Sequence, residues 1–303
     1  MTKTKHKAGY VAVIGKPNVG KSTLLNAILG TKTFITSRKA QTTRNNILAI
    51  KNLSGGQIVF LDTPGIHNRN KKALNKVLNK SALSIIADTD LIVFMCQPTL
   101  HANDITVIKA VKEAEVPAIC VINKIDQVKN KNSLLPLMEQ ISQEHDFLEI
   151  ASTSATKKDG IDELMELILD HLPEQDPLYE GAIELSSKER LFQVDEIVRE
   201  KLIRQLGAEI PYELYVESII TEEDARLITI YSTIHVNKPS QKSIVVGNKG
   251  EMLKKIGTLA RKDLEKVFSK KVMLKLWVKS KANWSNDQKF INSLGIGSVK
   301  NAK

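Results

Sequence analysis

The chain reads Gly15-Lys16-Pro17-Asn18-Val19-Gly20-Lys21-Ser22 near its start. This stretch fits the pattern G-x-x-x-x-G-K-[ST], and it lies between the apolar run Tyr10–Ile14 and a helical pattern that begins near Thr23. The glycines let backbone N–H groups surround phosphate oxygens, and the N-terminus of the following helix adds its dipole. The pattern therefore predicts that residues 15–23 bind the phosphates of a nucleotide, with Lys21 on the β- and γ-phosphates and Ser22 on Mg²⁺.

Six short apolar runs lie around this loop within residues 1–172. They lack polar alternation, which is typical of strands covered on both faces of a mostly parallel sheet. Amphipathic segments separate them, and Lys71–Ala87 is the clearest of these. This alternation predicts an α/β doubly wound domain. The predicted strands are Tyr10–Ile14, Ile47–Ile50, Ile58–Leu61, Leu91–Cys96, Ala118–Ile122 and Leu148–Ala151.

Two further segments are predicted to contact the γ-phosphate and the metal ion. Asp62-Thr63-Pro64-Gly65 follows the predicted strand Ile58–Leu61, where Asp62 can hold Mg²⁺ through water and the Gly65 amide can sense a γ-phosphate. The polar loop Gln41-Thr42-Thr43-Arg44 is positioned as a first switch, and one threonine should add its hydroxyl to the Mg²⁺ shell. We favour Thr43 and keep Thr42 as the alternative. The residues expected to take part in hydrolysis are Lys21, Thr43 and Gly65.

The tetrapeptide Asn123-Lys124-Ile125-Asp126 follows the run Ala118–Ile122 and indicates a base selector. The Asp126 carboxylate can accept hydrogen bonds from the N1–H and the exocyclic amine of guanine, donors that adenine lacks at those positions. The Lys124 stem can cover the ring, and Asn123 can tie its loop to the phosphate-binding segment. Near the last strand end, Ser154 and Ala155 can supply a backbone N–H to guanine O6. Four motifs in this order, each at the carboxyl end of a predicted strand, predict a GTP-binding domain.

The residue after Gly65 is Ile66, at the position where Ras-like GTPases place a water-orienting Gln. An isoleucine cannot orient water, so hydrolysis should be slow unless another group supplies charge or polarity. With this hydrophobic residue, the first two motifs resemble those of the TrmE–Era–EngA branch of GTPases. Several members of that branch use a potassium ion that the Asn of the phosphate-binding loop helps to coordinate. The resemblance implies that Asn18 holds K⁺ against the phosphates and that K⁺ stimulates turnover.

A domain boundary is predicted at His171-Leu172-Pro173-Glu174-Gln175-Asp176-Pro177, because two prolines prevent the preceding helix from continuing. A capping box at Ser186-Ser187-Lys188-Glu189 then opens a new helix. Strands are predicted at Tyr212–Ile220 and Leu227–Val236. A second domain therefore begins on a helix followed by two strands.

This second domain continues with Gly247-Asn248-Lys249-Gly250, a G-x-x-G loop that opens an amphipathic helix. The helix is expected to turn its apolar side chains inward from Met252 to Val267. A last strand alternates apolar and polar residues over 272–279. With a short connecting segment before the loop, the element order reads α-β-β-α-α-β.

The formal net charge of +10 is concentrated at the C-terminal end. Residues 238–303 contain 16 Lys and Arg against 4 Asp and Glu, whereas residues 1–180 contain 22 against 19. This imbalance favours a polyanionic partner, and two glycines let a sugar-phosphate backbone approach the loop closely. An ordinary glycine-rich helix start and a solvated lysine face are the alternatives. The residues expected to bind single-stranded RNA are Gly247, Asn248, Lys249, Gly250, Lys242, Lys254 and Lys255.

The order α-β-β-α-α-β with this loop resembles a type II KH domain. A GTPase domain joined to it by a short linker is similar, over essentially the whole chain, to the Era family of bacterial ribosome-assembly GTPases; Ser37–Arg44, Ile244–Gly250 and Trp277-Val278-Lys279 add to the likeness. The resemblance implies binding to the 3′ end of 16S ribosomal RNA, maturation of the small (30S) subunit and peripheral contact with the inner membrane. We expect a monomer with a GTPase domain over 1–172, a linker over 173–185, a KH domain over 186–283 and a basic tail over 284–303.

Other readings compete with this one. A membrane-surface signalling GTPase would place the basic end on anionic lipid, but the charge accompanies a glycine-bracketed loop and not an amphipathic helix with aromatic anchors. GTP-dependent RNA modification is weaker, because no cysteine or metal-ligand cluster accompanies the motifs. The only cysteines, Cys96 and Cys120, lie in apolar runs and indicate a reducing compartment, so we expect a cytoplasmic protein. In the tail, Trp284 is expected either to stack on a base or to pack.

Overall fold

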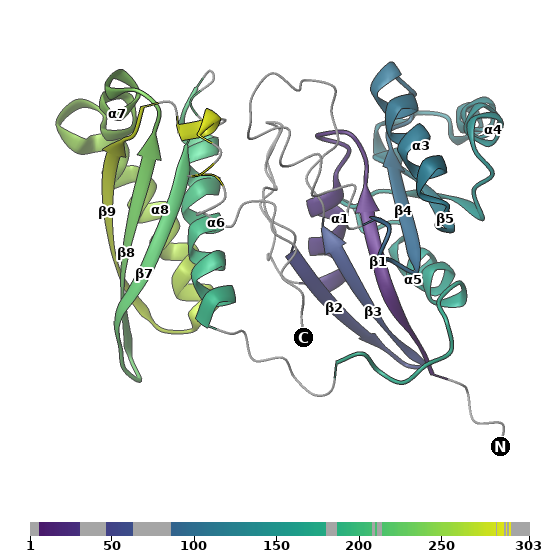
Figure 1. The fold of residues 1–303 in the computed structure, drawn as a ribbon, viewed down its shortest axis with the longest axis horizontal. Helices are drawn as coiled ribbons and strands as arrows, with labels where there is room; N and C mark the ends of the chain where they lie inside the picture. The colour runs from purple at the N-terminus through teal and green to yellow at the C-terminus, as the bar shows by residue number, and fades with distance from the viewer. Residues whose placement is uncertain are drawn as a thin grey trace. The chain divides into compact units, whose positions relative to one another are not determined.

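A computed structural model describes residues 6–30, 47–62, 86–179, 187–207, 210, 214–282, 284–287, 289 and 291 of the 303-residue chain. These residues form two compact units, unit 1 within Met1–Gly181 and unit 2 over Ala182–Ile291. Each unit has its own sheet and its own helices, as Figure 1 shows. The expected α/β domain followed by a smaller α+β domain is thus confirmed.

Unit 1 is built on a six-stranded sheet with the order β2-β3-β1-β4-β5-β6 (Figure 1). All neighbouring strands run parallel except β2, which pairs antiparallel with β3, so the prediction of a mostly parallel sheet is confirmed. Every residue of β4 and β5 is buried, as unalternating apolar runs require. The strands are β1 (Lys7–Ile14), β2 (Ile47–Leu53), β3 (Gly56–Asp62), β4 (Leu91–Cys96), β5 (Ala118–Asn123) and β6 (Glu149–Thr153).

Helices cover both faces of this sheet. On one face, α1 (Lys21–Leu29) and α5 (Ile161–Asp170) pack against side chains such as Val11 and Val13 of β1. On the other face, α3 (Ala102–Ala114) and α4 (Leu135–Glu144) pack against Ala12, Ile14 and their neighbours. Short 3₁₀ turns η1 (Ile125–Gln127) and η2 (Lys131–Leu134) follow β5. Because both faces are covered, the strand ends are the part of this sheet that a ligand can reach.

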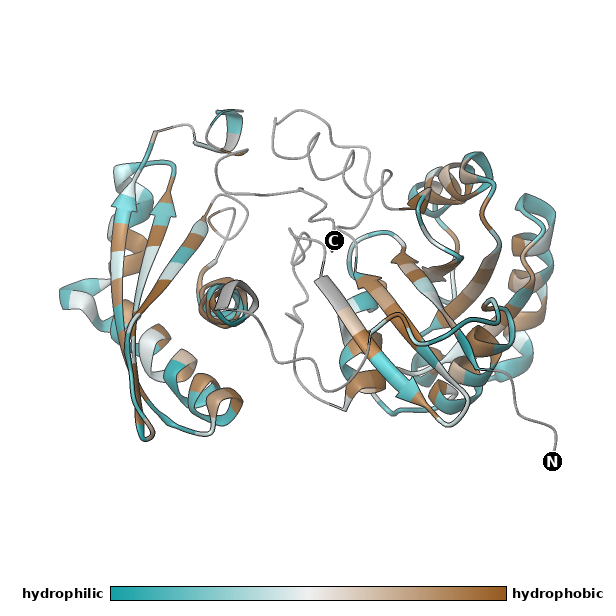
Figure 2. Ribbon diagram, turned by 60° about the horizontal axis from the view of Figure 1, so that its bottom comes forward, coloured by the Kyte–Doolittle hydropathy of each residue, from teal (hydrophilic) through white to brown (hydrophobic). Residues whose placement is uncertain are grey.

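Unit 2 has a three-stranded sheet of order β7-β8-β9, in which β7 (Tyr215–Glu223) is antiparallel and β9 (Lys271–Ser280) is parallel to β8 (Leu227–Val236). Helices α6 (Ser187–Gln205) and α8 (Glu251–Phe268) bury their apolar side chains against one face of it. Its strands alternate hydrophobic and hydrophilic residues in Figure 2. The remaining elements are α7 (Pro239–Val246), η4 (Asn248–Gly250) and η5 (Trp284–Asn286).

Several details differ from the sequence expectations. Val267 is 41% exposed, so its predicted inward position is wrong; the buried stripe of α8 consists of Ile256, Ala260 and Leu264. Trp284 is fully buried and lies 6.1 Å from the Tyr215 ring, so it packs. Most of the predicted helix Lys71–Ala87 lies outside the described residues. In the part of the chain that the structure describes, no helix is both long and apolar enough to cross a bilayer.

Candidate nucleotide site and RNA-binding loop

The predicted phosphate-binding loop joins β1 to α1. Gly15 and Gly20 both have positive φ, 155° and 111°. A Cβ at Gly15 would lie 2.5 Å from the Met95 carbonyl oxygen, and one at Gly20 would lie 2.3 Å from Asn123 Nδ2. Each glycine is therefore required by a close neighbour as well as by its backbone conformation.

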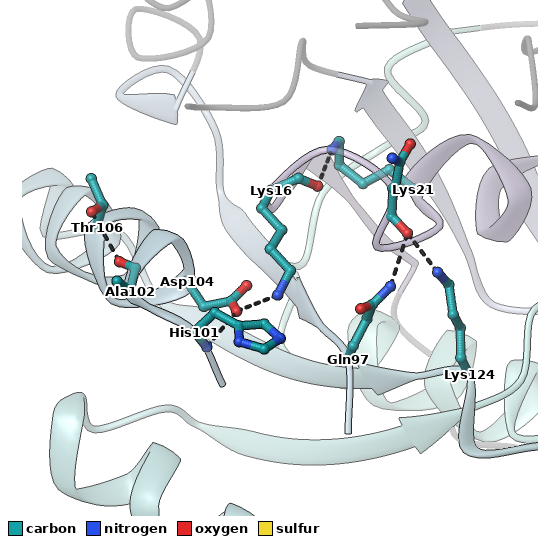
Figure 3. A network of polar contacts seen from close by, with 9 residues as sticks. Lys16, Lys21, Gln97, His101, Ala102, Asp104, Thr106 and Lys124 are labelled. Carbon is teal, nitrogen blue, oxygen red and sulfur yellow. Dashed lines mark hydrogen bonds and ion pairs between the residues drawn. The ribbon is translucent and has the colours of Figure 1, made fainter. Parts of the chain in front are cut away.

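Lys21, the first residue of α1, is buried and folds back over the loop. Its Nζ donates to the carbonyl oxygens of Gly15 at 2.9 Å and Lys16 at 3.3 Å, and Figure 3 shows the Lys16 contact. Burial lowers the pKa of Lys21 to about 8, and the charge of Asp62 works in the opposite direction. A buried ammonium held over a loop of backbone amides is suited to receive phosphate.

Ser22 and Asp62 bring a hydroxyl and a carboxylate together at the ends of α1 and β3. Ser22 Oγ donates to Asp62 Oδ2 at 3.4 Å, and both residues are buried. Mg²⁺ in phosphate-binding sites is held by one or two protein oxygen ligands plus substrate phosphates. This pair fits such an ion, and bound Mg²⁺ would neutralise negative charge on a terminal phosphate there.

Lys16 makes a contact that the motif does not anticipate. Its Nζ donates to Asp104 Oδ2 at 2.6 Å, and the two side chains are 11% and 0% exposed (Figure 3). The same Asp104 oxygen accepts the His101 N–H at 3.0 Å, which caps the start of α3. A buried ion pair thus fastens the beginning of the phosphate-binding loop to α3.

Asn18 stands at the exposed tip of the loop with a φ of 67°. Its carbonyl oxygen accepts two side-chain donors, Gln97 Nε2 at 3.0 Å and Lys124 Nζ at 2.6 Å (Figure 3). Burial lowers the pKa of Lys124, and the neighbouring Lys16 charge lowers it further, whereas Asp126 opposes both. The backbone of Asn18 is therefore held from two sides. Its neighbours Pro17 and Val19 are half-buried and buried, respectively.

Asn123 is the last residue of β5, Asp126 lies in the η1 turn that follows it, and Ser154 and Ala155 follow the neighbouring strand β6. Asn123 is buried; its Nδ2 donates to the Val19 carbonyl at 2.8 Å, and its Oδ1 accepts the Ala155 N–H at 3.1 Å. The Asp126 carboxylate is exposed and accepts Ser154 Oγ at 2.6 Å. The tie from Asn123 to the phosphate-binding loop is thus present, and a guanine O6 would compete with Asn123 for the Ala155 amide. Ile125, which precedes Asp126 in the sequence, is buried in the core.

The remaining predicted nucleotide contacts lie outside the described residues. They are Thr43 with its alternative Thr42, and the four residues that follow Asp62, namely Thr63, Pro64, Gly65 and Ile66. Thr23, by contrast, lies within α1 as predicted for the helix start. The structure therefore brings together the phosphate-binding loop Gly15–Ser22, the tetrapeptide Asn123–Asp126, and Ser154 with Ala155. Of the segment that begins at Asp62, it describes the aspartate.

In unit 2 the G-x-x-G loop forms η4 between α7 and α8. Gly247 has a φ of 75°, and a Cβ there would lie 2.6 Å from Met252 Cβ; Gly250 has a φ of 84° with open space around it. Lys249 also has a left-handed conformation, with φ 47° and ψ 26°. This tight loop ends at the N-terminus of the 18-residue helix α8, a place that favours phosphate. The predicted RNA-binding residues Lys242, Asn248, Lys249, Lys254 and Lys255 are all exposed around it, as is the acidic Glu251 in the first turn of α8.

Comparison with known proteins covers both units. A family model described as "50S ribosome-binding GTPase" matches residues 10–124, and one described as "KH domain" matches residues 209–285. GTPase Era of Coxiella burnetii (strain Dugway 5J108-111) is 44% identical over 288 residues, which are 95% of this chain and 97% of that protein. The chain belongs to the Era family of GTPases.

Other Era proteins agree over the same length. GTPase Era of Pseudomonas fluorescens (strain Pf-5) is 42% identical over 98% of this chain and 99% of its own. An Era structure in complex with MgGDPNP and nucleotides 1506–1542 of 16S ribosomal RNA is 38% identical, with a TM-score of 0.91 over 96% of this chain and 99% of that one. An Aquifex aeolicus Era variant bound to GDP·AlF4⁻ is also 38% identical, with a TM-score of 0.89 over 95% of this chain and 99% of that one.

Sequence reasoning missed three residues that position this Era-family nucleotide site. Asp104 and Gln97 hold the phosphate-binding loop and the His101 N–H orients Asp104, yet none of the three belongs to a GTPase motif. The signal for Asp104 was partial, because an acidic residue in the first turn of α3 is a capping position. Its pairing with Lys16, 88 residues away, has no mark in the sequence.

Proposed function

We propose that this chain is a GTP-binding and GTP-hydrolysing switch that binds the 3′ end of 16S ribosomal RNA through unit 2 and acts in small-subunit assembly. The observation that carries the proposal is the likeness, over 96% of the chain, to an Era structure holding MgGDPNP and nucleotides 1506–1542 of 16S ribosomal RNA. Both ligands of that complex have a matching feature in this chain.

Unit 1 supplies the nucleotide site. Gly15–Thr23 and Lys21 receive the phosphates, Ser22 and Asp62 hold Mg²⁺ with Thr43, and Asp126 selects guanine with the help of Asn123, Lys124, Ser154 and Ala155. The buried Ser22–Asp62 pair and the exposed Asp126 carboxylate support these assignments. When bound, Mg²⁺ neutralises charge that develops on the transferred phosphate. Lys21 adds its own positive charge to the same oxygens.

Unit 2 supplies the RNA site. The left-handed turn from Gly247 to Gly250 lets a sugar-phosphate backbone come close, and Lys249 stands exposed within it. Lys242, Lys254 and Lys255 surround the loop with positive charge. These features support RNA binding without requiring any contact from unit 1.

Crosslinking to ribosomal subunits tests the function directly. The full-length protein loaded with GDPNP is crosslinked to small subunits, and the attached RNA is sequenced. Reads should gather at the 3′ end of 16S ribosomal RNA. Reads gathered elsewhere would overturn the RNA assignment and leave the GTPase activity standing.

Asn18 is proposed to place a potassium ion at the phosphates, in the role that an arginine finger has elsewhere. Its backbone is held by Gln97 and Lys124, and its side chain is exposed at the loop tip. GTP hydrolysis should be faster in K⁺ than in Na⁺, and Asn18→Ala should remove the difference while GDP still binds. Equal wild-type rates in the two salts would contradict this role.

The nucleotide state is proposed to control RNA binding, because γ-phosphate and Mg²⁺ order switch segments in this class of GTPase. The affinity of the full-length protein for the RNA of nucleotides 1506–1542 should differ between its GDPNP and GDP forms. Identical affinities, measured by fluorescence anisotropy with both nucleotides saturating, would remove the coupling and leave the two binding sites independent.

A further inference from the structure

The sheet of unit 2 has one covered face and one open face. Helices α6 and α8 pack on the first through the buried side chains of the core, such as Val216, Ile234 and Leu264. On the second face, Ile219 of β7 is 55% exposed, Met273 of β9 is 46% exposed and Trp277 of β9 is 61% exposed. Exposed apolar residues are ordinary one at a time, but three large ones on the same face of a sheet indicate an interaction surface.

Strand β9 contributes most of this face. Its outward residues alternate between basic and apolar in the order Lys271, Met273, Lys275, Trp277 and Lys279, and we call these five residues the β9 strip. All five are exposed, and β9 contains no acidic residue. A strand rises about 3.3 Å per residue, so successive lysines of the strip are spaced by about 13 Å. The strip is therefore a row of positive charges with an aromatic ring in it.

The neighbouring strand reinforces the strip. Tyr231 of β8 is paired with Lys275 in the register, and Ile219 of β7 is paired with Tyr231. Lys275 Nζ lies 4.7 Å from the centre of the Tyr231 ring, on the side of the hydroxyl, to which it donates at 2.7 Å. This contact holds an ammonium group against an aromatic ring beside Trp277.

The chain itself covers one end of the open face. The Tyr215 ring lies 6.1 Å from Trp284 and 6.2 Å from the His235 ring, and Trp284 is fully buried. The two tryptophans of the chain thus have opposite environments, since Trp277 is 61% exposed. The exposed residues of this face include the β9 strip and, on β7, Glu217 and Ile219, whereas Tyr231 and Thr233 of β8 are half-buried.

We propose that the β9 strip is a second RNA contact, on which a base of a single strand stacks against Trp277 while its phosphates pair with Lys275 and Lys279. The proposal rests on the function proposed above, in that the chain binds RNA, and adds a surface on the opposite face of the sheet from α8. Single-strand binding proteins combine a basic track with aromatic side chains in this way. The cores of protein interfaces are depleted in lysine, so the spacing of charge favours RNA over a protein partner.

The two tryptophans make the test specific. The full-length protein is titrated with the RNA of nucleotides 1506–1542 of 16S ribosomal RNA, and tryptophan emission is followed alongside the anisotropy of labelled RNA. Stacking on Trp277 should quench the wild-type emission as RNA binds. Trp277→Phe should lose that quenching, because the remaining Trp284 is buried, and should keep its affinity within about threefold because a phenyl ring still stacks.

Affinity measurements complete the test. Trp277→Ala should weaken RNA binding by about tenfold, the size expected for one lost base stack. Val267→Ala, which trims an exposed apolar side chain on α8, is the matched control and should leave the affinity unchanged. Lys275→Ala should weaken binding by a smaller factor and reduce its dependence on salt concentration.

The outcomes separate this proposal from the function on which it rests. The β9 strip would be overturned as an RNA contact if RNA did not quench the emission of the wild-type protein and if Trp277→Ala bound RNA with wild-type affinity. The face would then be left to a protein partner. If Lys249→Glu abolishes binding in the same assay, RNA recognition by the G-x-x-G loop stands regardless. If the wild-type protein does not bind this RNA at all, the β9 strip and RNA recognition by the G-x-x-G loop are both overturned.

Discussion

The two sheets of this protein differ in how many of their faces are covered by helices. In unit 1 the strands β4 and β5 are buried along their whole length, because helices cover both faces. In unit 2 helices cover one face, and the other keeps Trp277 and Met273 in contact with solvent. A sheet covered on both faces offers ligands only its strand ends, whereas a sheet covered on one face also offers a surface. The nucleotide site of unit 1 lies at strand ends, and the proposed β9 strip of unit 2 lies on an open sheet face.

Burial also separates the energetics of the two sites. The groups around the phosphate-binding loop, such as Lys21, Asp62 and Asp104, are nearly inaccessible to water. The lysines of the G-x-x-G loop and of the β9 strip are exposed. Electrostatic interactions are stronger in the low dielectric of a buried site and are screened at the surface. Substitutions should therefore have large effects in unit 1 and smaller effects in unit 2.

The largest effect is expected for Lys21→Ala. This change removes a buried ammonium from the phosphate site and should weaken GDP and GTP binding by about 3 kcal/mol, or more than a hundredfold. Calorimetric titration of nucleotide into the protein measures it. Lys131→Ala, at an exposed lysine on η2, should leave the affinity unchanged. A less than fivefold loss in Lys21→Ala would show that burial does not strengthen this site.

Asp104→Ala should have an effect of nearly the same size. It leaves Lys16 charged and largely buried without its carboxylate, which should destabilise unit 1 by about 3 kcal/mol and loosen the phosphate-binding loop. Chemical denaturation and nucleotide titration should both register the loss. A second change, Lys16→Met, should restore most of the stability because it removes the stranded charge. If the double variant is no more stable than Asp104→Ala, the ion pair is not the reason for the loss.

Two glycines of unit 2 offer a matched pair. Gly247→Ala should cost about 2 kcal/mol and distort the loop, because its Cβ meets Met252 in a backbone conformation that suits glycine alone. Gly250→Ala should cost about 1 kcal/mol, since only the left-handed φ opposes it and the space is open. Thermal unfolding measures both changes. Equal losses at the two positions would mean that the Met252 contact relaxes.

The smallest effect is expected at the surface cluster of Glu223, Arg190 and Lys270. Hydrogen bonds from Arg190 and then Lys270 lower the pKa of Glu223 to about 2, from 4.5. A carboxylate whose pKa is lowered by folding stabilises the fold at pH values above its pKa in the unfolded chain. This stability is lost as the pH falls from about 4.5 toward 2. Because the group is partly exposed, Glu223→Gln should cost less than about 1 kcal/mol at pH 7. Urea denaturation at pH 7 and pH 3 should show a smaller difference between variant and wild type at the lower pH.

Much of the fold could be predicted from the sequence, because the patterns that indicate strands and helices are made by neighbouring residues. Every predicted strand of unit 1 appears, within a few residues, since a run of apolar residues without alternation suits a strand buried on both faces. The strand ends then carried the motifs, because parallel strands present their carboxyl ends at one edge. Val267 was misplaced because helical periodicity alone does not say how wide a stripe the sheet covers.

By itself, the sequence determined which residues could bind phosphate, guanine and RNA, since the positions of glycines, lysines and carboxylates within a loop are properties of a few neighbouring residues. Only the tertiary structure decided what holds those loops in place. Lys16 meets Asp104 across 88 positions, and Lys124 reaches the Asn18 carbonyl across 106. The tertiary structure also decided that Trp284 is buried and Trp277 is exposed, because burial depends on which elements pack over a side chain and not on the side chain itself.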